Sequence, residues 1–416
     1  MNVASYALTD VGRRRTENED AFIADEEVGL FAVCDGMGGH AAGEIASTLA
    51  LEILRKEVRS NTRVLRALAA DASGQHRAAA VELMERAVQR ACREIYRMAE
   101  ADPTKRGMGT TCAALLIAGG KGVIAHVGDS RIYLLRNGQL HQLTEDHTLV
   151  QTQLKQGVIT PDEAETSPFR NVITRAVGIQ ESVQVDTLLT DILPGDLFLL
   201  CSDGLHGYLD EAETQRLLST ESPDRLPRIL VDLANERGGR DNITVVIVRA
   251  TGAADPERVS EAEARLQAIQ RIPLFRHLTY KEQMAVLAIA HSRSWDAGRI
   301  IVEEGQPGDQ LFIVVKGRVS IETEGQVLAE LRPGAHFGEM GLIEHAPRFA
   351  TVRAVEPTTC VVLGRNELLA LMRREPVLAV KLLWSLVHAL SERLRAANAG
   401  MAMKGRRSDP TFFGKP

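Results

Sequence analysis

Short apolar runs that end on an acidic residue recur through the first 250 residues of the chain. The run Leu30–Cys34 has the length and residue types of a buried strand, and Asp35 follows it directly. Between such runs, apolar residues recur at helical spacing over about Ala41–Val58 and again over 81–99, which predicts two amphipathic helices that cover a sheet. A polar connection rich in Ala, Ser and Gly is expected between these helices.

Five aspartates stand at the ends of five apolar strands in this half of the chain. A lone Asp-Gly pair after a strand most often marks a solvated turn, so one such acid carries little information. Strand ends come together in a sheet, however, and carboxylates gathered there repel one another unless cations lie between them. Oxygen ligands without His or Cys partners favour Mg²⁺ or Mn²⁺. The predicted metal site comprises Asp20, Asp35, Asp129, Asp203 and Asp241.

Other polar residues between the strands have simpler explanations. Thr160 and Glu163 flank Pro161 in the pattern of a capping box, in which both side chains satisfy free backbone amides at a helix start. Asp146 and His147 have the chemical types of catalytic residues, but the helix-like segment that follows them favours a capping or loop role.

The pattern changes near residues 250–256, where small residues and a proline replace the apolar runs. A helix is expected over Ser260–Ile272, opened by a capping box between Ser260 and Glu263 and stopped by Pro273. A second, shorter helix is expected from Thr279, again with a capping box. Short strands with regular turns follow, and their density predicts a small barrel or jelly roll.

Composition narrows the class of protein. The 416 residues are enough for two or three domains, and the five cysteines show no C-x-x-C spacing and mostly sit inside apolar runs, which favours a reducing, cytoplasmic location. No apolar run approaches the roughly 20 residues of a membrane span, so no membrane partner is expected. The net charge of -6, with basic clusters that lack interleaved aromatics, argues against nucleic acid as a partner.

Five motifs in the first half resemble those of the metal-dependent type 2C protein phosphatases in order and spacing. The motifs are D-x-G-x-x-R-x-x-N-E-D, D-G-M-G-G-H, G-D-S-R, S-D-G-L and G-R-D-N, and the similarity covers about Val3 to Arg249. The resemblance implies an α+β fold, a β-sandwich of two antiparallel sheets flanked by helix pairs. It also implies a protein serine/threonine phosphatase, a phosphoric monoester hydrolase that acts on phosphorylated proteins.

The same resemblance implies roles for individual residues. Arg15 falls where the family grips the substrate phosphate, and Glu19 falls where an acid orients the attacking water. Met37 stands where many members carry a proposed general acid; His40 is a candidate for that role, although a loop or helix-start role is favoured. The implied metal ligands are Asp20, Asp35, the Gly36 carbonyl, Asp203 and Asp241 for two cations and Asp129 for a third, weaker one, with Arg15, Glu19 and Asp20 as the catalytic set.

The stretch Leu274–Arg395 resembles a cyclic nucleotide-binding domain, including a G-D-x-x-F-x-x-x-x-G-x-V segment from Gly308 to Val319. Glycines with free backbone amides, here around Gly338, make a cradle for an anion. In the family, the glutamate at the place of Glu339 binds the ribose hydroxyl and the arginine at the place of Arg348 binds the cyclic phosphate. The resemblance therefore implies a cyclic nucleotide as effector.

Two departures from that family bear on the ligand. Phe349 replaces a small or hydroxyl-bearing residue, which favours cAMP over cGMP, and Gly341 replaces a common alanine. The final predicted helix, Val377–Arg395, carries an apolar face for which core or dimer packing is favoured over a nucleotide lid. A homodimer is therefore one expectation.

The predicted organisation is a phosphatase domain (1–250), a linker and helix (251–273), a cyclic nucleotide-binding jelly roll with flanking helices (274–395) and a disordered tail (396–416). The predicted function is a metal-dependent protein serine/threonine phosphatase regulated by cyclic nucleotide. Two alternatives stay open: an active phosphatase whose second domain only dimerises, and a non-catalytic cyclic-nucleotide-responsive scaffold. The protein substrate and the direction of control do not follow from the sequence.

Overall fold

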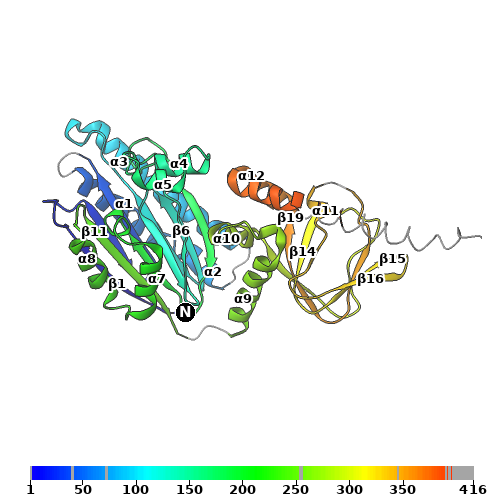
Figure 1. Ribbon diagram of the computed structural model, residues 1–416. Coiled ribbons are helices and arrows are strands. Elements are labelled where there is room, and N and C mark those ends of the chain that lie inside the picture. Colours follow the sequence, from blue (N-terminus) through cyan, green and yellow to red (C-terminus); the bar gives the residue numbers. More distant parts are fainter. Residues whose placement is uncertain are drawn as a thin grey trace, which may run out of the picture. The chain divides into compact units, whose positions relative to one another are not determined.

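A computed structural model describes residues 2–38, 42–70, 74–252, 256–343, 346–388, 391 and 395. The chain folds as two compact units, Met1–Ser260 and Glu261–Pro416 (Figure 1). The predicted site residue His40 and the predicted disordered tail lie outside the described residues. None of the helices in the described ranges has the length and apolar character needed to cross a membrane.

The first unit alternates strands with helices. Its elements are β1 (Asn2–Asp10), β2 (Asp20–Asp25), β3 (Leu30–Met37), α1 (Ala42–Ser60), α2 (Thr62–Ala70), α3 (Gly74–Ala101), η1 (Pro103–Lys105), β4 (Gly109–Thr110), β5 (Cys112–Ala118), β6 (Lys121–Val127), β7 (Arg131–Arg136), β8 (Gln139–Gln142), α4 (Leu149–Lys155), α5 (Pro161–Thr166), β9 (Asp186–Asp191), β10 (Leu197–Cys201), α6 (Asp203–His206), α7 (Glu211–Thr220), α8 (Leu226–Glu236) and β11 (Ile243–Thr251).

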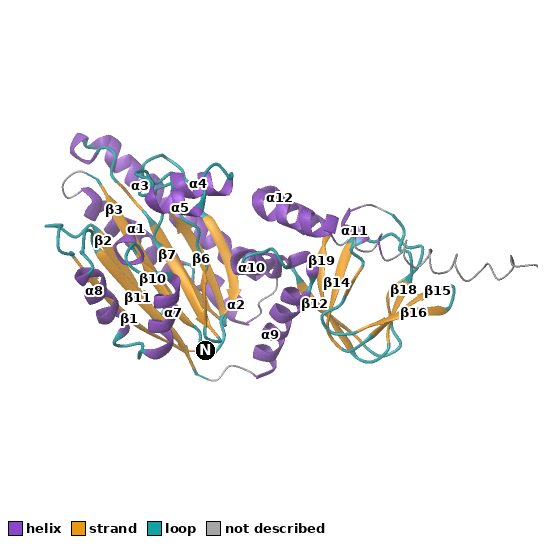
Figure 2. Cartoon of the chain, viewed as in Figure 1, coloured by secondary structure: helices purple, strands orange, loops and turns teal. Residues whose placement is uncertain are grey.

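Two antiparallel sheets pack face to face in this unit. One sheet has the strand order β1-β11-β10-β7-β8, and the other has the order β2-β3-β5-β6-β9, with β4 paired to β3. Helices α1 and α3 contact the second sheet and each other, whereas α7 and α8 contact the first sheet. Figure 2 shows the strands between helices on either side. The predicted sandwich flanked by helix pairs is thus confirmed.

The largest difference from the predicted helices lies between α1 and α3. The predicted polar connection contains α2, because Leu65 and Leu68 face inward while the arginines around them stay at the surface. The capping box between Thr160 and Glu163 is confirmed at the start of α5. Asp146 and His147 do not cap α4, since Thr148 occupies that position and accepts from the Gln151 amide.

The second unit is built from short strands preceded and followed by helices. Its elements, together with the helix that spans the boundary, are α9 (Pro256–Arg271), η2 (Pro273–Phe275), α10 (Tyr280–Ile289), β12 (His291–Trp295), β13 (Ile300–Val302), β14 (Gln310–Lys316), β15 (Val319–Thr323), β16 (Gln326–Leu331), β17 (His336–Phe337), α11 (Met340–Ile343), β18 (Thr351–Ala354), β19 (Thr358–Gly364), α12 (Arg365–Arg374) and a further helical stretch over 376–388.

The strands of this unit form two antiparallel four-stranded sheets, β12-β19-β14-β17 and β13-β18-β15-β16, as the predicted jelly roll requires. Phe312, Phe337 and Val362 belong to the core between them. The capping box at Thr279 is confirmed. The predicted start at Ser260 is wrong, because α9 begins at Pro256 and Ser260 lies inside the helix, where its amide already has a helical place.

Candidate active site

The first two predicted metal ligands lie opposite each other on neighbouring strands. Asp20 is the first residue of β2, and Asp35 lies near the end of β3, directly across the antiparallel ladder. Asp20 is buried and Asp35 is half-buried. Thr110 and Thr111 hold the Asp35 backbone, because the Thr110 hydroxyl and the Thr111 amide both donate to its carbonyl. Side chains at directly opposite positions project from the same face of a sheet.

The next two acids come from the other sheet. Asp203 opens α6 immediately after β10, and Asp241 stands just before β11, the strand that pairs with β10. Asp20 joins the two sheets, since its Oδ2 accepts from Ser202 Oγ and from Thr244 Oγ1, each at 2.7 Å. The acids of four separate chain segments are thereby brought to one edge of the sandwich.

Asp129 lies where the chain crosses from one sheet to the other, between β6 and β7. Its side chain is buried, and its backbone carbonyl accepts from Nε2 of His206 at 2.9 Å. His206 belongs to α6, the short helix that begins with Asp203. One turn of helix therefore ties the Asp203 segment to the Asp129 turn.

The electrostatics of this cluster are unfavourable for bare carboxylates. Burial, followed by the charges of Asp203 and Asp241, raises the pKa of Asp20 to about 7. Burial and the charge of Asp203 raise the pKa of Asp129 to about 7 as well. Burial and the neighbouring acids raise the pKa of Asp35 well above its usual range. The five acids therefore interact as one charge cluster.

Two oxygens of this cluster lack partners within the described chain. Oδ1 of Asp20 and Oδ1 of Asp203 are buried without a hydrogen bond. A buried, unpaired carboxylate oxygen is costly, and a hard cation is the group that would satisfy it. In the described ranges, however, no three His, Cys, Asp or Glu side chains already stand in an arrangement that could hold a metal. Hydrogen bonds from Ser202, Thr244 and Arg15 engage oxygens of Asp20 and Asp241, which accounts for this.

Arg15 and Glu19 lie at the mouth of the cluster. The Arg15 guanidinium donates to Asp241 Oδ2 at 2.8 Å, and about half of its side chain is exposed. Glu19 is positioned through its backbone, since its amide donates to Asn242 Oδ1 at 2.8 Å and its carbonyl accepts from the Gly36 amide. Burial raises the pKa of Glu19, and the charge of Arg15 opposes that rise.

Gly36 is required by space. A Cβ at Gly36 would meet the Gly43 carbonyl oxygen at 2.1 Å, so a larger residue would displace the start of α1. Met37, at the predicted general-acid position, is the last residue of β3 and pairs with Gly109. An unbranched thioether cannot donate a proton, so Met37 itself is no acid.

Four residues that the sequence interpretation did not single out hold the site together: Ser202, Asn242, Thr244 and His206. Ser202 and Asn242 lie inside the quoted S-D-G-L and G-R-D-N motifs, so a polar residue next to each aspartate was the available signal. Asp146, by contrast, is bound by Arg131 through two hydrogen bonds at 2.9 and 2.7 Å and serves the turn after β6.

The predicted nucleotide residues of the second unit also lie together. Arg348 donates to the carbonyls of Gly338 and Gln310 at 3.2 and 3.0 Å, and its guanidinium lies 5.8 Å from the centroid of the Phe312 ring. Burial lowers the pKa of Arg348, while Asp309 and then Glu339 oppose that shift. The arginine is thus held in place by backbone carbonyls beside Glu339.

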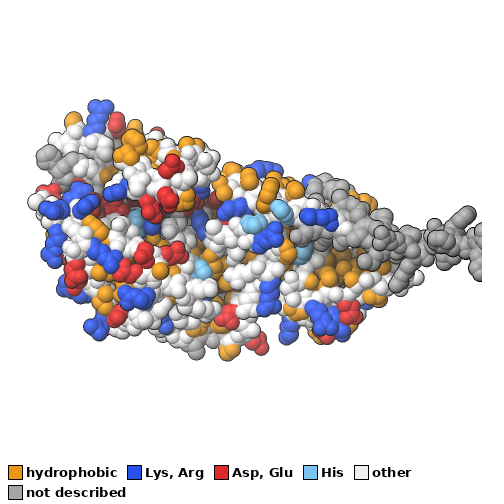
Figure 3. Space-filling view, in the orientation of Figure 1, with side chains coloured by type: hydrophobic (Ala, Val, Ile, Leu, Met, Phe, Trp, Pro, Cys, Tyr) orange, Lys and Arg blue, Asp and Glu red, His pale blue; other side chains and the backbone are white. Residues whose placement is uncertain are grey.

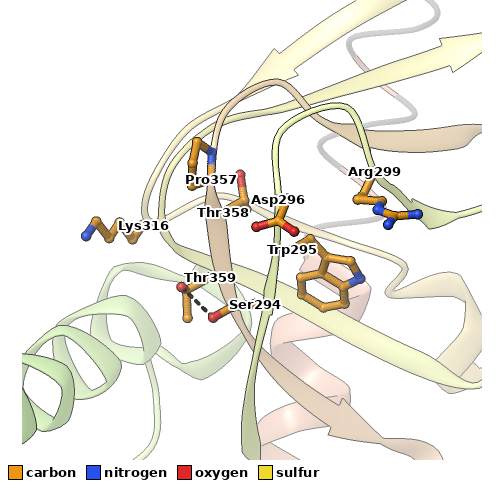
Figure 4. Close-up of a pocket in the computed structure, with 8 residues that line it drawn as sticks. All are labelled: Ser294, Trp295, Asp296, Arg299, Lys316, Pro357, Thr358 and Thr359. Carbon is orange, nitrogen blue, oxygen red and sulfur yellow. Dashed lines mark hydrogen bonds between the residues drawn. The ribbon is translucent and has the colours of Figure 1, made fainter.

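Phe349, next in the chain, is 82% exposed and therefore does not fill this site with its own ring. A separate pocket of about 340 Å³ in the same unit includes Trp295, Asp296, Arg299 and Lys316 in its lining (Figure 4). Figure 4 shows the side chains of Lys316 and Arg299 extending in opposite directions, so their charges do not converge on one point. None of the predicted nucleotide residues lines this pocket.

Comparison with known proteins identifies both units. Residues 12–235 match the family model Protein phosphatase 2C, and residues 292–375 match the model Cyclic nucleotide-binding domain. The serine/threonine phosphatase stp of Listeria innocua is 38% identical over 244 residues, which is 58% of this chain and 93% of that protein.

Solved structures agree with this result. The serine/threonine phosphatase PstP/Ppp of Mycobacterium tuberculosis has 36% identity and a TM-score of 0.54, over 61% of this chain and all of that one. The catalytic domain of PstP in complex with two manganese ions has 35% identity and a TM-score of 0.52, over 60% of this chain and 99% of that one. The fold and site are thus those of a protein phosphatase.

The chain belongs to the protein phosphatase 2C family and carries a cyclic nucleotide-binding domain after its phosphatase domain. Its activity is that of a protein serine/threonine phosphatase. The predicted enzyme class is confirmed, and the alternative of a non-catalytic scaffold loses its support.

Proposed function

We propose that this phosphatase depends on Mn²⁺ or Mg²⁺, held at the acidic edge of the sandwich. The two buried, unpartnered oxygens of Asp20 and Asp203 carry this proposal. Bound cations would supply neutralising charge, an activated water and contacts to the phosphate oxygens. The proposed ligands are Asp20, Asp35, the Gly36 carbonyl, Asp203 and Asp241 for two ions, with Asp129 for a third.

The side chains around these ligands prepare the site for an anion. Arg15 is half exposed, so its guanidinium can leave Asp241 for two oxygens of a substrate phosphate with little displacement of the backbone. Glu19, fixed by Asn242 at its amide, holds a carboxylate beside Gly43, where it can orient the attacking water. Asp20, Glu19 and Arg15 thus follow one another along the path from cation to substrate.

Calorimetric titration of the full chain with Mn²⁺ tests the metal site without relying on turnover. Wild type is expected to bind two ions, and Asp203→Asn is expected to lose at least one of them because a neutral amide cannot replace a carboxylate ligand. Asp146→Asn is the matched control, since Arg131 engages that carboxylate outside the site. Unchanged binding by Asp203→Asn, or full hydrolysis of phosphopeptides in EDTA, would contradict the proposal.

We also infer that cyclic nucleotide, bound at Gly338, Glu339 and Arg348, regulates the phosphatase. The hydrogen bonds that hold Arg348 beside Glu339 support this, because they keep a cation at the place where the phosphate would bind. The lack of a hydroxyl at Phe349 supports cAMP over cGMP. A cytoplasmic location is our further proposal, since all five cysteines are free and buried.

A second candidate role for the C-terminal unit is dimerisation. Over 376–388, Val380, Leu383, Trp384 and Val387 recur at helical spacing and are each at least half exposed. An apolar stripe of this kind favours packing against another helix. Sedimentation of the full chain with and without cAMP, at protein concentrations from 1 to about 100 times a micromolar baseline, separates the two roles.

A further inference from the structure

Two chain segments at the rim of the catalytic site, residues 12–15 and 238–241, run side by side. The Arg13 amide donates to the Gly239 carbonyl at 2.7 Å, and Arg15 pairs with Asp241 at 2.8 Å. The packing leaves no space between them, because a Cβ at Gly239 would lie 2.8 Å from Cγ of Arg13. Whatever these segments expose is therefore presented within two residues of Arg15 and Asp241.

The segments expose cations that the protein itself leaves unpaired. Arg13, Arg14 and Arg240 are exposed, and no side-chain hydrogen bond or ion pair joins any of them to the rest of the described chain. Nearby Arg237 differs, since it is paired with Glu213. We name Arg13, Arg14 and Arg240 the basic rim.

The rest of the surface gives this cluster its meaning. Figure 3 shows acidic and basic side chains interspersed over the visible face of the first unit. Most of the described arginines near the site have a carboxylate partner, as Arg15, Arg131 and Arg237 do. Glu17 is the exposed acid of the same stretch, so the basic rim keeps a positive excess beside a site whose interior is acidic.

We infer that the basic rim makes this phosphatase select phosphoserine and phosphothreonine residues that are flanked by acidic side chains. An extended peptide advances about 3.3 Å per residue, so a phosphate held by Arg15 places the flanking residues over the arginines next to it. Acidic flanks meet unpaired guanidinium groups there. Basic flanks would meet like charge, and selection works as much through that repulsion as through attraction.

The size of the effect follows from the exposure of the arginines. Solvent and salt screen exposed charge pairs, so each pair contributes only a small factor, about two- to fivefold. The three arginines together should therefore favour an acidic peptide over a neutral one by on the order of tenfold in kcat/KM. A purely solvated set of arginines predicts no preference.

The test uses the full chain with Mn²⁺ and three phosphothreonine peptides of equal length, which carry acidic, neutral or basic residues on both sides of the phosphorylated residue. The measured quantity is the ratio of kcat/KM between acidic and neutral peptides. Wild type should give a ratio of about ten, Arg13→Gln/Arg14→Gln/Arg240→Gln a ratio near one, and the corresponding triple lysine variant most of the wild-type ratio. Arg228→Gln, an exposed arginine on α8 paired with Asp232, is the matched control.

The ratio cancels any general loss of activity in a variant. A wild-type ratio near one, or a triple glutamine variant that keeps the wild-type ratio, would overturn the inference. If the triple glutamine variant does not fold, Arg14→Gln/Arg240→Gln gives the same comparison with a smaller expected change. Raising ionic strength from about 0.1 to 1 M should shrink the wild-type preference, because the Debye length falls from about 10 to 3 Å. A preference that persists in high salt would contradict an electrostatic rim.

Discussion

Hydrogen-bond partners differ from one carboxylate of the catalytic site to the next. Asp20 uses one oxygen for Ser202 and Thr244 and keeps the other buried without a partner, whereas Asp241 has an oxygen engaged by Arg15. The hydroxyls can stay where they are when a cation binds, because Oδ1 of Asp20 is still available. Arg15 has to compete with the cation for Asp241, which couples the phosphate-binding residue to the metal site.

Arg15→Ala is expected to lower kcat/KM for phosphopeptides by about 2 kcal/mol, on the order of 30-fold, because a charged contact to the phosphate is lost. Mn²⁺ affinity should not fall, since removal of the guanidinium frees an oxygen of Asp241. Steady-state kinetics and calorimetry on the same samples measure the two quantities. If kcat/KM is unchanged, Arg15 has only a surface role.

Asp25, at the far end of β2, predicts a pH-dependent stability. Its side chain is 5% exposed and accepts from Arg55 at 2.8 Å and from Arg59 at 3.0 Å. Burial alone would raise the pKa of Asp25, but the hydrogen bond from Arg55 and the two cationic charges lower it overall. A lowered pKa means that the carboxylate stabilises the fold above its unfolded pKa and that this contribution disappears as the pH falls.

Asp25→Asn should therefore lower the free energy of unfolding at pH 7 by about 1 to 2 kcal/mol. The difference from wild type should shrink as the pH falls below about 4, because both side chains are then neutral. Urea unfolding of both proteins between pH 7 and pH 3 measures this. Glu27→Gln is the control, since that side chain is 82% exposed and should matter little. A difference that grows on acidification would contradict the assignment.

Elements whose ends depend on neighbouring residues were predicted well, and elements that depend on distant packing were not. The capping boxes at Thr160 and Thr279 need only residues three positions apart, and both form. Helix α2 was missed because its signal is an apolar face of only nine residues, which the sheet and α3 cover. The early start of α9 reflects a proline at the first helical position, where its missing N–H has no consequence.

The loop before β14 carries an element-scale prediction about the nucleotide site. A Cβ at Gly308 would lie 1.9 Å from Nε of Arg348, so this loop and the arginine can pack together only around a glycine. Gly308→Ala should displace the guanidinium and weaken cAMP binding about tenfold or more. Titration with a fluorescent cAMP analogue measures the change. Gly74→Ala is the control, since an added Cβ there meets nothing within 4 Å; equal affinity in both variants would exclude this role for Gly308.

At the scale of the whole molecule, the two units are joined through α9, a 16-residue helix that the unit boundary divides. A helix transmits a displacement better than a flexible tether of the same length. Nucleotide binding in the second unit is therefore expected to change the activity of the first. Couplings of this kind typically amount to about 1 to 3 kcal/mol, or roughly 5- to 150-fold in affinity.

Saturating cAMP should change phosphopeptide turnover or binding in wild type but not in Arg348→Ala, and bound phosphopeptide should shift cAMP affinity by the same factor as cAMP shifts phosphopeptide affinity. Arg299→Ala provides the control, because that arginine lines the separate pocket of Figure 4. If cAMP binds wild type and neither quantity changes, regulation by this route is wrong and dimerisation is the better explanation for the second unit. If no cyclic nucleotide binds, Phe349 is the first residue to replace.

The sequence by itself determined the strands, the capped helices, the order of the aspartates and, through the motifs, both families. These features are encoded in residues that are close together in the chain, as apolar periodicity, a capping pair or an acid next to a glycine. For the same reason, the fold class and the candidate metal ligands could be named before any contact was known.

Only the tertiary structure decided which side chains meet. Asp20 contacts Ser202 and Thr244 across 182 and 224 residues, and Arg15 contacts Asp241 across 226. Such contacts depend on how two sheets stack and where the strands end, because burial and the need to satisfy polar groups act on the assembled sandwich and leave no periodic signal in the chain. The partners of each carboxylate, the carbonyls that hold Arg348 and the unpaired arginines of the basic rim are therefore consequences of packing.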